Sequence, residues 1–202
     1  MRNILKFITL FLFVFSMQAQ KKPIKIKDEL VKNRLNLYAI NENLIDYDIT
    51  VIVKGTGFKQ RAGKPRLTRI PATSRIKISS LVVERNKEPK YTYLVVANDS
   101  LSRRSLRPEF TAVKVDPPIP VFLYVSDRCV GCDSLVSSLN SSVFNYEKIN
   151  LSTELEKASK LEKYLPGMDT IKKPILNIGG YLYTNITTMD QLLEKLLAKE
   201  SK

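Results

Sequence analysis

The stretch VFLYVSDRCVGC, residues 121–132, holds both cysteines of this 202-residue chain. An apolar run of the kind that forms a buried strand precedes Cys129 and Cys132, and helix-forming residues follow them. Two cysteines at this spacing can ligate a metal, staple a loop or exchange electrons with the disulfide of another protein. The residues around the pair must decide among these three.

Periodic segments continue after the cysteines. We expect strands over residues 120–125, 146–151, 174–178 and 181–184, and helices over 130–139, 154–164 and 189–199. The order βαβαββα predicts an α/β domain over residues 117–202. Its last helix should pack on the sheet through a stripe of leucines, which are Leu192, Leu193, Leu196 and Leu197.

The first half of the chain alternates with period two. Strands are expected over residues 34–40, 46–54, 74–83 and 91–98, with turn residues between them. This spacing predicts an antiparallel β-sandwich of Ig-like architecture over residues 21–116, and hence an α+β protein overall. In KVDPPIPVF, residues 114–122, three prolines mark the boundary between the two predicted domains.

Positive charge is concentrated in the first half. Residues 21–118 hold 21 Lys and Arg against 10 Asp and Glu, whereas residues 119–202 hold 10 of each sign. An anionic partner is therefore an alternative for the predicted sandwich, and nucleic acid is not expected for a secreted chain. We expect solvation alone for most of the bases at polar or loop positions, which include Lys64, Arg66, Arg69, Arg75 and Lys77.

The first 20 residues, MRNILKFITLFLFVFSMQAQ, are typical of a signal peptide. The apolar run over residues 7–17 is shorter than the roughly 20 residues that span a bilayer, so a retained anchor is the weaker alternative. Cleavage is expected near Ala19. The mature chain would then be soluble in the periplasm or another extracytoplasmic space.

The composition excludes several kinds of chemistry. The chain has no histidine, which removes Ser-His-Asp triads, Cys-His pairs and His-ligated zinc. Two cysteines cannot close a four-thiolate zinc site, and a bridge between residues three apart constrains little of the unfolded chain. We therefore expect no cofactor other than a redox-active disulfide between Cys129 and Cys132.

A C-x-x-C between a buried strand and a helix has a specific chemical meaning. Cys129 is expected at or just before the first helical turn, where free N–H groups and the helix dipole stabilise a thiolate. Arg128 adds to this effect, whereas Asp127 and Asp133 oppose it. Because the thiolate is the nucleophile, Cys129 is predicted to attack and Cys132 to resolve.

Residues 120–199 resemble a thioredoxin-superfamily domain, nearer to the glutaredoxin branch. The resemblance is carried by VFLYVSDRCVGC, by its spacing to KKPILNIGGYLY (residues 172–183) and by the closing helix. It implies a cis Pro174 facing the cysteines, a substrate groove formed by Pro174, Lys173 and Arg128, and exchange with thiols and disulfides of envelope proteins.

The chain also departs from that superfamily's motifs. Arg128 stands where thioredoxins usually have Trp, and Val-Gly replaces Gly-Pro between the cysteines. Lys172-Lys173 replaces the Thr-Val of glutaredoxins, and TNITTMDQL (residues 184–192) lacks their glycine pair. The glutathione motifs are incomplete, which argues against glutathione as a partner.

Two alternatives remain open at this point. The cysteine pair could carry Cu(I), because thiolates select soft metal ions. The chain could also be a binding module in which the sandwich provides the function and the thiol domain only packs.

Overall fold

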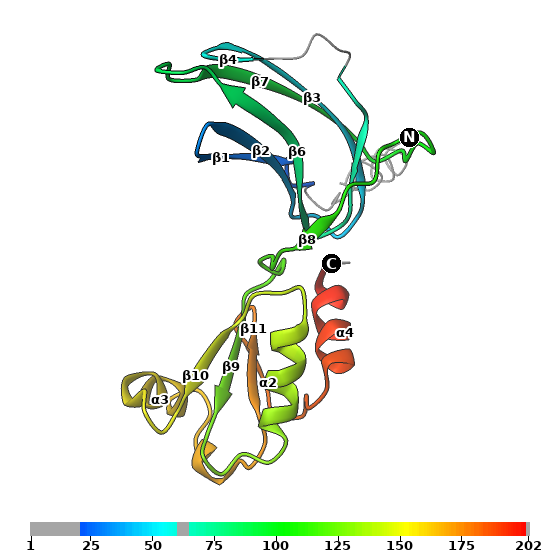
Figure 1. Ribbon diagram of the computed structural model, residues 1–202. Helices are drawn as coiled ribbons and strands as arrows, with labels where there is room; N and C mark the ends of the chain where they lie inside the picture. Colours follow the sequence, from blue (N-terminus) through cyan, green and yellow to red (C-terminus); the bar gives the residue numbers. More distant parts are fainter. Residues whose placement is uncertain (1–20, 60–64, 201–202) are drawn as a thin grey trace, which may run out of the picture.

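The computed structural model describes residues 21–59 and 65–200 (Figure 1). The predicted signal peptide and Lys64 lie outside the described residues. Among the helices of the described part, none combines the length and the apolar character needed to cross a membrane.

Two antiparallel sheets form the N-terminal part, drawn at the top of Figure 1. The first has the strand order β1-β2-β6-β4, with β8 also paired to β6, and the second has the order β5-β3-β7. The first sheet comprises β1 (Lys25–Val31), β2 (Arg34–Asn41), β4 (Phe58–Lys59), β6 (Ser74–Val83) and β8 (Phe110–Ala112). The second comprises β3 (Tyr47–Thr56), β5 (Thr68–Ile70) and β7 (Lys90–Asn98).

The two sheets share one apolar interior. Buried Leu35, Leu37 and Leu81 of the first sheet cluster with Val53 of the second. A neighbouring cluster joins residues of both sheets in the same way, namely Ala39, Tyr47, Ile49, Ile70 and Ile76. Alternate residues of each strand thus face inward, and the expected antiparallel sheets are confirmed.

Two bases of the N-terminal part do more than remain solvated, so that expectation is wrong for Arg69 and Arg75. Arg69 Nε lies 2.9 Å from Oδ1 of Asp48, a carboxylate only 1 % exposed. Arg75 lies 2.5 Å from Glu29 and stacks 3.8 Å above the Tyr38 ring. Both pairs join separate strands, because antiparallel register brings distant residues together.

A mixed sheet and three α-helices form the C-terminal part. The sheet has the order β10-β9-β11-β12: β10 is parallel to β9, and the other neighbours are antiparallel. Its strands are β9 (Val121–Val125), β10 (Glu147–Asn150), β11 (Ile175–Ile178) and β12 (Tyr181–Tyr183). The helices are α2 (Cys132–Ser141), α3 (Leu155–Glu162), α4 (Met189–Glu200) and the short 3₁₀ helix η1 (Met168–Thr170). The predicted βαβαββα order is confirmed.

Helices cover both faces of this sheet (Figure 1). On one face, Leu123 and Val125 of β9 pack with residues of α2 and α4, among them Leu139 and Leu192. On the other, Ile175 packs with Leu161 of α3 and with η1. In the predicted leucine stripe, Leu192 and Leu196 are buried and Leu193 is half-buried, while the Leu197 side chain lies outside the described residues.

A short paired segment connects the two parts. Val115 is buried and exchanges backbone hydrogen bonds with Val143 and Asn145, at 2.8 Å each. The Asn145 side chain donates to Asp116 at 2.7 Å. The C-terminal part therefore holds the chain just ahead of the prolines. The boundary near residue 117 stays a prediction.

Candidate functional site

Cys129 and Cys132 form a disulfide, with their Cα atoms 5.7 Å apart. Cys129 lies in the turn after β9, a central strand of the mixed sheet, and Cys132 is the first residue of α2. The turn after β9 is closed by a hydrogen bond of 3.0 Å from the Cys129 N–H to the Ser126 carbonyl. This turn leads the chain from the C-terminal end of β9 toward the start of α2.

The helix begins later than expected. We predicted a start at residue 130, but α2 begins at Cys132 because Gly131 has a φ of 81°. A residue in this left-handed conformation cannot continue a right-handed helix, and glycine adopts it without steric cost. An added Cβ at Gly131 would meet nothing within 4 Å, so the glycine serves backbone conformation rather than close packing.

The two sulfurs occupy different environments. Cys132 is 6 % exposed and belongs to the apolar cluster beneath α2, whereas Cys129 is half-buried at the rim of that cluster. Val130, between them, is 71 % exposed. A partner protein approaching the disulfide would therefore meet Val130 and Cys129 before Cys132.

The N-terminus of α2 lies at this disulfide. No side chain caps the helix, so its first N–H groups are left without a side-chain acceptor in the described structure. Such groups and the helix dipole favour negative charge, which a reduced Cys129 or Cys132 would carry as a thiolate. Asp133 in the first turn shares the same field and partly offsets it.

Strand register brings the predicted groove residues to this edge of the sheet. Ile175 pairs with Tyr124, so Lys173 and Pro174, which immediately precede β11, lie beside the end of β9. The Val130 N–H donates to the Lys172 carbonyl at 2.7 Å and ties the cysteine turn to that segment. Pro174 is buried, whereas Lys173 and Arg128 are exposed.

The expected cis bond at Pro174 is wrong. No cis peptide bond occurs in residues 21–59 or 65–200, so the Lys173–Pro174 bond is trans. With this geometry the chain ahead of Pro174 runs so that the Lys172 carbonyl accepts a hydrogen bond from Val130. Pro174 lies buried immediately ahead of β11, and its place in a substrate groove stays a prediction.

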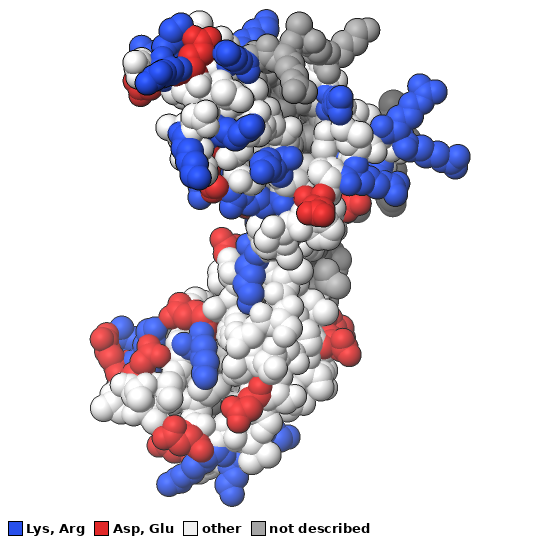
Figure 2. All heavy atoms as spheres, in the orientation of Figure 1, with Lys and Arg blue, Asp and Glu red and all other residues white. Residues whose placement is uncertain are grey.

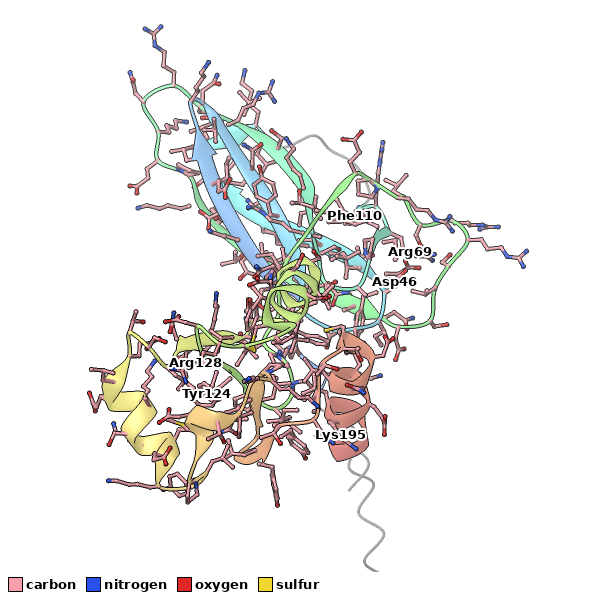
Figure 3. All side chains as sticks on the ribbon, turned by 90° about the horizontal axis from the view of Figure 1, so that it is seen from below. Asp46, Arg69, Phe110, Tyr124, Arg128 and Lys195 are labelled. Atoms are coloured by element: carbon pink, nitrogen blue, oxygen red, sulfur yellow. A yellow bond between two sulfur atoms is a disulfide. The ribbon has the colours of Figure 1, made fainter. Side chains whose placement is uncertain are left out.

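Arg128 lies on the loop after β9, in the same region as Tyr124 in Figure 3. Tyr124 belongs to the opposite face of the sheet, where it packs on the cluster that contains Leu161 and Ile175. Because side chains alternate along a strand, Tyr124 points away from α2. It therefore contributes to packing beneath α3 and not to the surface around the disulfide.

Sequence reasoning missed the contribution of Val130 and of the Lys172 main chain. The exposure of Val130 had a signal in the sequence, because Gly131 before Cys132 could have marked the helix start and left Val130 in the turn. The hydrogen bond to Lys172 had none, since it joins residues 42 positions apart through strand register.

A comparison of the chain with protein-family models, curated proteins and solved structures found no match. The site must therefore be interpreted from its own geometry. Within the part of the chain that the structure describes, no three His, Cys, Asp or Glu side chains are grouped closely enough to hold a metal ion.

Proposed function

We propose that this protein is a thiol-disulfide oxidoreductase that exchanges electrons through Cys129 and Cys132. The observation that carries the proposal is the disulfide itself, with a buried sulfur at the first residue of α2 and a more exposed one in the preceding turn. Such a pair offers one sulfur to a partner and keeps the second close enough to complete the exchange.

The architecture around the disulfide supports a thioredoxin-like, and more narrowly glutaredoxin-like, domain. The sheet order β10-β9-β11-β12 places the strand that precedes the cysteines in the interior, flanked by a parallel and an antiparallel neighbour. Helices α2 and α4 share one face, and α3 covers the other. The trans Pro174 departs from the geometry that the resemblance implied, so the likeness rests on topology and on the cysteine pair.

The proposed exchange proceeds in two balanced steps. In the reduced protein, the Cys129 thiolate attacks one sulfur of a substrate disulfide, forms a mixed disulfide and releases the other substrate sulfur as a thiolate. The Cys132 thiolate then attacks the Cys129 sulfur, which closes the Cys129–Cys132 disulfide and releases the second substrate thiolate. Two electrons pass from the cysteine pair to the substrate, and oxidation of a substrate dithiol reverses the same steps.

Burial assigns the two roles. Cys129 can be reached from solvent, whereas Cys132 is enclosed by core residues of α2 and the sheet. A thiolate must reach the partner sulfur in line with the bond that it breaks, which favours Cys129 as the sulfur that contacts the substrate. Val130, exposed beside it, would contact the apolar side of an extended partner segment.

The proposed partners are protein thiols and disulfides of the cell envelope. This assignment rests on the signal-like residues 1–20 and on the use of the cysteine pair in an oxidising compartment. An extracytoplasmic location follows from the same argument. Glutathione is not proposed, because the motifs that would bind it are incomplete.

The test is a turnover assay with a disulfide-bonded protein such as insulin and dithiothreitol as electron donor. The native protein should accelerate reduction, and the Cys129→Ser/Cys132→Ser double variant should lose the acceleration. Ser138→Ala, on the exposed side of α2, provides a control that keeps both cysteines. Equal rates for native and double-variant proteins would overturn the proposal.

A further inference from the structure

The connection between β7 and β8 forms an exposed loop that carries three arginines and several apolar side chains. We call residues 99–109, DSLSRRSLRPE, the arginine loop. Arg103, Arg104 and Arg107 are exposed and form no ion pair in the described part of the chain. Large positive groups without acidic partners are available to a ligand outside the chain.

The arginine loop is held rigidly at its base. The Ser102 N–H and the Ser105 hydroxyl both donate to Oδ2 of the buried Asp48, at 2.5 Å each. Arg69 donates to the same carboxylate and, at 2.8 Å, to the Ser102 carbonyl. Arg103 and Arg104 lie at the tip of the turn between these two anchored serines, so the turn presents them to solvent at little further entropic cost.

Exposed apolar side chains surround the same loop. Five of them are between 45 and 57 % exposed, which are Leu44, Ile45, Leu101, Leu106 and Phe110. Phe110 and Arg107 also border an open cleft of about 500 Å³ with Asp46 and Arg69, and Figure 3 shows Asp46, Arg69 and Phe110 on one side of the N-terminal part. Arginines combined with solvent-exposed leucine and phenylalanine are typical of surfaces that bind at the lipid interface.

The loop that contains Leu44 and Ile45 lies next to the arginine loop. Lys21 Nζ pairs with Asp99 at 2.5 Å, and the next residue, Lys22, donates its N–H to Asn43 at 2.8 Å. The adjacent residues Lys21 and Lys22 thus contact the arginine loop and the loop of Leu44 and Ile45, respectively. The two loops and the chain entering at Lys21 form one surface, with Lys21 and Lys22 adding to its bases.

We propose that this surface, formed by the arginine loop, Leu44 and Ile45, binds the face of an anionic lipid bilayer. The three free arginines match acidic headgroups, and the apolar side chains can enter the headgroup boundary. This proposal is independent of the redox function of Cys129 and Cys132.

One other place on the N-terminal part combines exposed apolar side chains with exposed bases, because Leu30 and Val31, 59 and 52 % exposed, precede Lys32 and Arg34. Figure 2 shows basic side chains at many places on this part, whereas acidic and basic groups are mixed on the C-terminal part. Several of the other bases are paired within the chain, as Lys25 is with Glu42 and Arg75 is with Glu29. The arginine loop is distinguished by three unpaired arginines on a turn that is anchored to the buried Asp48.

The absence of tryptophan from the chain allows a direct test on the mature protein that remains after the predicted cleavage near Ala19. Leu101→Trp and Leu106→Trp each introduce one indole into the arginine loop. Leu155→Trp introduces one on α3, at a position that is 71 % exposed, as the matched control. Each protein is mixed with vesicles of brominated phosphatidylcholine, with or without phosphatidylglycerol, because bromine on the acyl chains quenches an indole that enters the bilayer.

We expect strong quenching at residues 101 and 106 in the anionic vesicles, weak quenching in the neutral ones, and weak quenching at residue 155 in both. Adding Arg103→Glu and Arg104→Glu should weaken vesicle binding by at least about tenfold, since each base near an anionic surface contributes separately. The same charge change at Lys27→Glu and Arg34→Glu, on β1 and β2, should have a smaller effect.

Three results would overturn the proposal. One is an absence of quenching in the loop, and another is equal quenching at residues 101, 106 and 155. The third is a response of the loop indoles to soluble poly-glutamate but not to anionic vesicles, which would assign the surface to an acidic protein.

Discussion

The two parts of the molecule use buried polar groups in opposite ways. All six buried polar or charged side chains of the described residues lie in the N-terminal part, namely Asn36, Asn41, Asp48, Thr73, Ser74 and Ser105. The C-terminal part buries apolar residues and Cys132, and its polar groups stay at the surface. The N-terminal part therefore fixes its loops through internal hydrogen bonds, whereas the C-terminal part places its disulfide at the edge of an apolar core.

Asn41 illustrates the N-terminal pattern. It is fully buried, and its side-chain amide donates to the carbonyls of Ile45 and Pro71 at 2.8 and 3.0 Å. Its oxygen accepts from the Asn43 N–H at 3.0 Å. A buried polar side chain with all these partners stabilises one loop conformation, and removing it would leave several groups unsatisfied.

The largest stability effect should come from the Asp48 network. Asp48→Ala removes a buried carboxylate that accepts hydrogen bonds from Arg69, the Ser102 N–H and the Ser105 hydroxyl. We expect a loss of about 3–5 kcal/mol in the free energy of unfolding, measured by urea denaturation. Glu84→Ala, which breaks the surface pair with Lys87, should leave the urea midpoint nearly unchanged. Similar losses for both variants would contradict the expectation that the buried Asp48–Arg69 pair stabilises the fold more than the exposed Glu84–Lys87 pair does.

A core substitution in the C-terminal part should have the next largest effect. Leu192→Ala removes a side chain that is 1 % exposed and should cost about 2–5 kcal/mol. Hydrogen exchange should show the loss of protection in residues 121–196, while Asp48→Ala should affect residues 25–112. Leu193→Ala, at the half-buried neighbour, should cost less. Equal loss of protection throughout the chain in both variants would show one cooperative unit and remove the predicted boundary near residue 117.

The sequence predicted the elements whose burial alternates clearly. Residues 74–83 were expected as a strand and form β6 with the same bounds, because inward and outward side chains alternate along most of it. In β1, five of the seven residues are exposed, so an edge strand of this kind carries little hydrophobic pattern and was missed. Periodicity therefore identified most strands, among them the edge strands β7, β10 and β12, but missed the exposed β1 and the short strands β4, β5 and β8.

Other features depend on contacts between distant residues. The pairing of Arg69 with Asp48 follows from the register of β3 and β5, which composition alone does not determine. The cysteine pair, its place after a strand and the order of later elements were predicted from local pattern. The isomer of the Lys173–Pro174 bond was inferred from resemblance alone, and this inference was wrong.

Acid should affect the N-terminal part first. Burial raises the pKa of Asp48, but hydrogen bonds from Arg69, Ser105 and the Ser102 N–H outweigh it, and the pKa lies below its usual value. The unfolded chain binds a proton at higher pH than the folded one, so this stabilisation is complete above about pH 4 and is lost as pH falls through the folded-state pKa. Asp48→Asn should flatten the dependence of the urea midpoint on pH in that range.

Salt provides the control for the acid experiment. The carboxyl pKa values of Glu154 and Glu156 are also lowered, mainly by hydrogen bonds from Lys157 and Lys160, but these pairs lie on the surface. Screening at about 1 M salt weakens exposed pairs far more than buried ones. An acid dependence that vanished in high salt, or that was the same in Asp48→Asn, would exclude Asp48 as its cause.

Opening the disulfide should have a smaller stability effect than Asp48→Ala or Leu192→Ala. The bridge joins residues only three apart, so it constrains the unfolded chain by about 1–2 kcal/mol, and Cys132 can remain packed in the core when reduced. The urea midpoint should shift little on reduction, and the Cys129→Ser/Cys132→Ser variant should behave like the reduced protein. A loss as large as that of Leu192→Ala would indicate a structural rather than an exchangeable bridge.

Covalent trapping tests the central claim most directly. Reduced Cys132→Ser and Cys129→Ser proteins are each incubated with insulin, and adducts are identified by mass spectrometry before and after dithiothreitol. The account predicts that Cys132→Ser forms an adduct through Cys129 that the reductant dissolves, because the exposed sulfur attacks and no second sulfur releases it. Cys129→Ser should form none. Adducts that form faster through Cys132, or that form in neither variant, would contradict the assigned roles of the two cysteines.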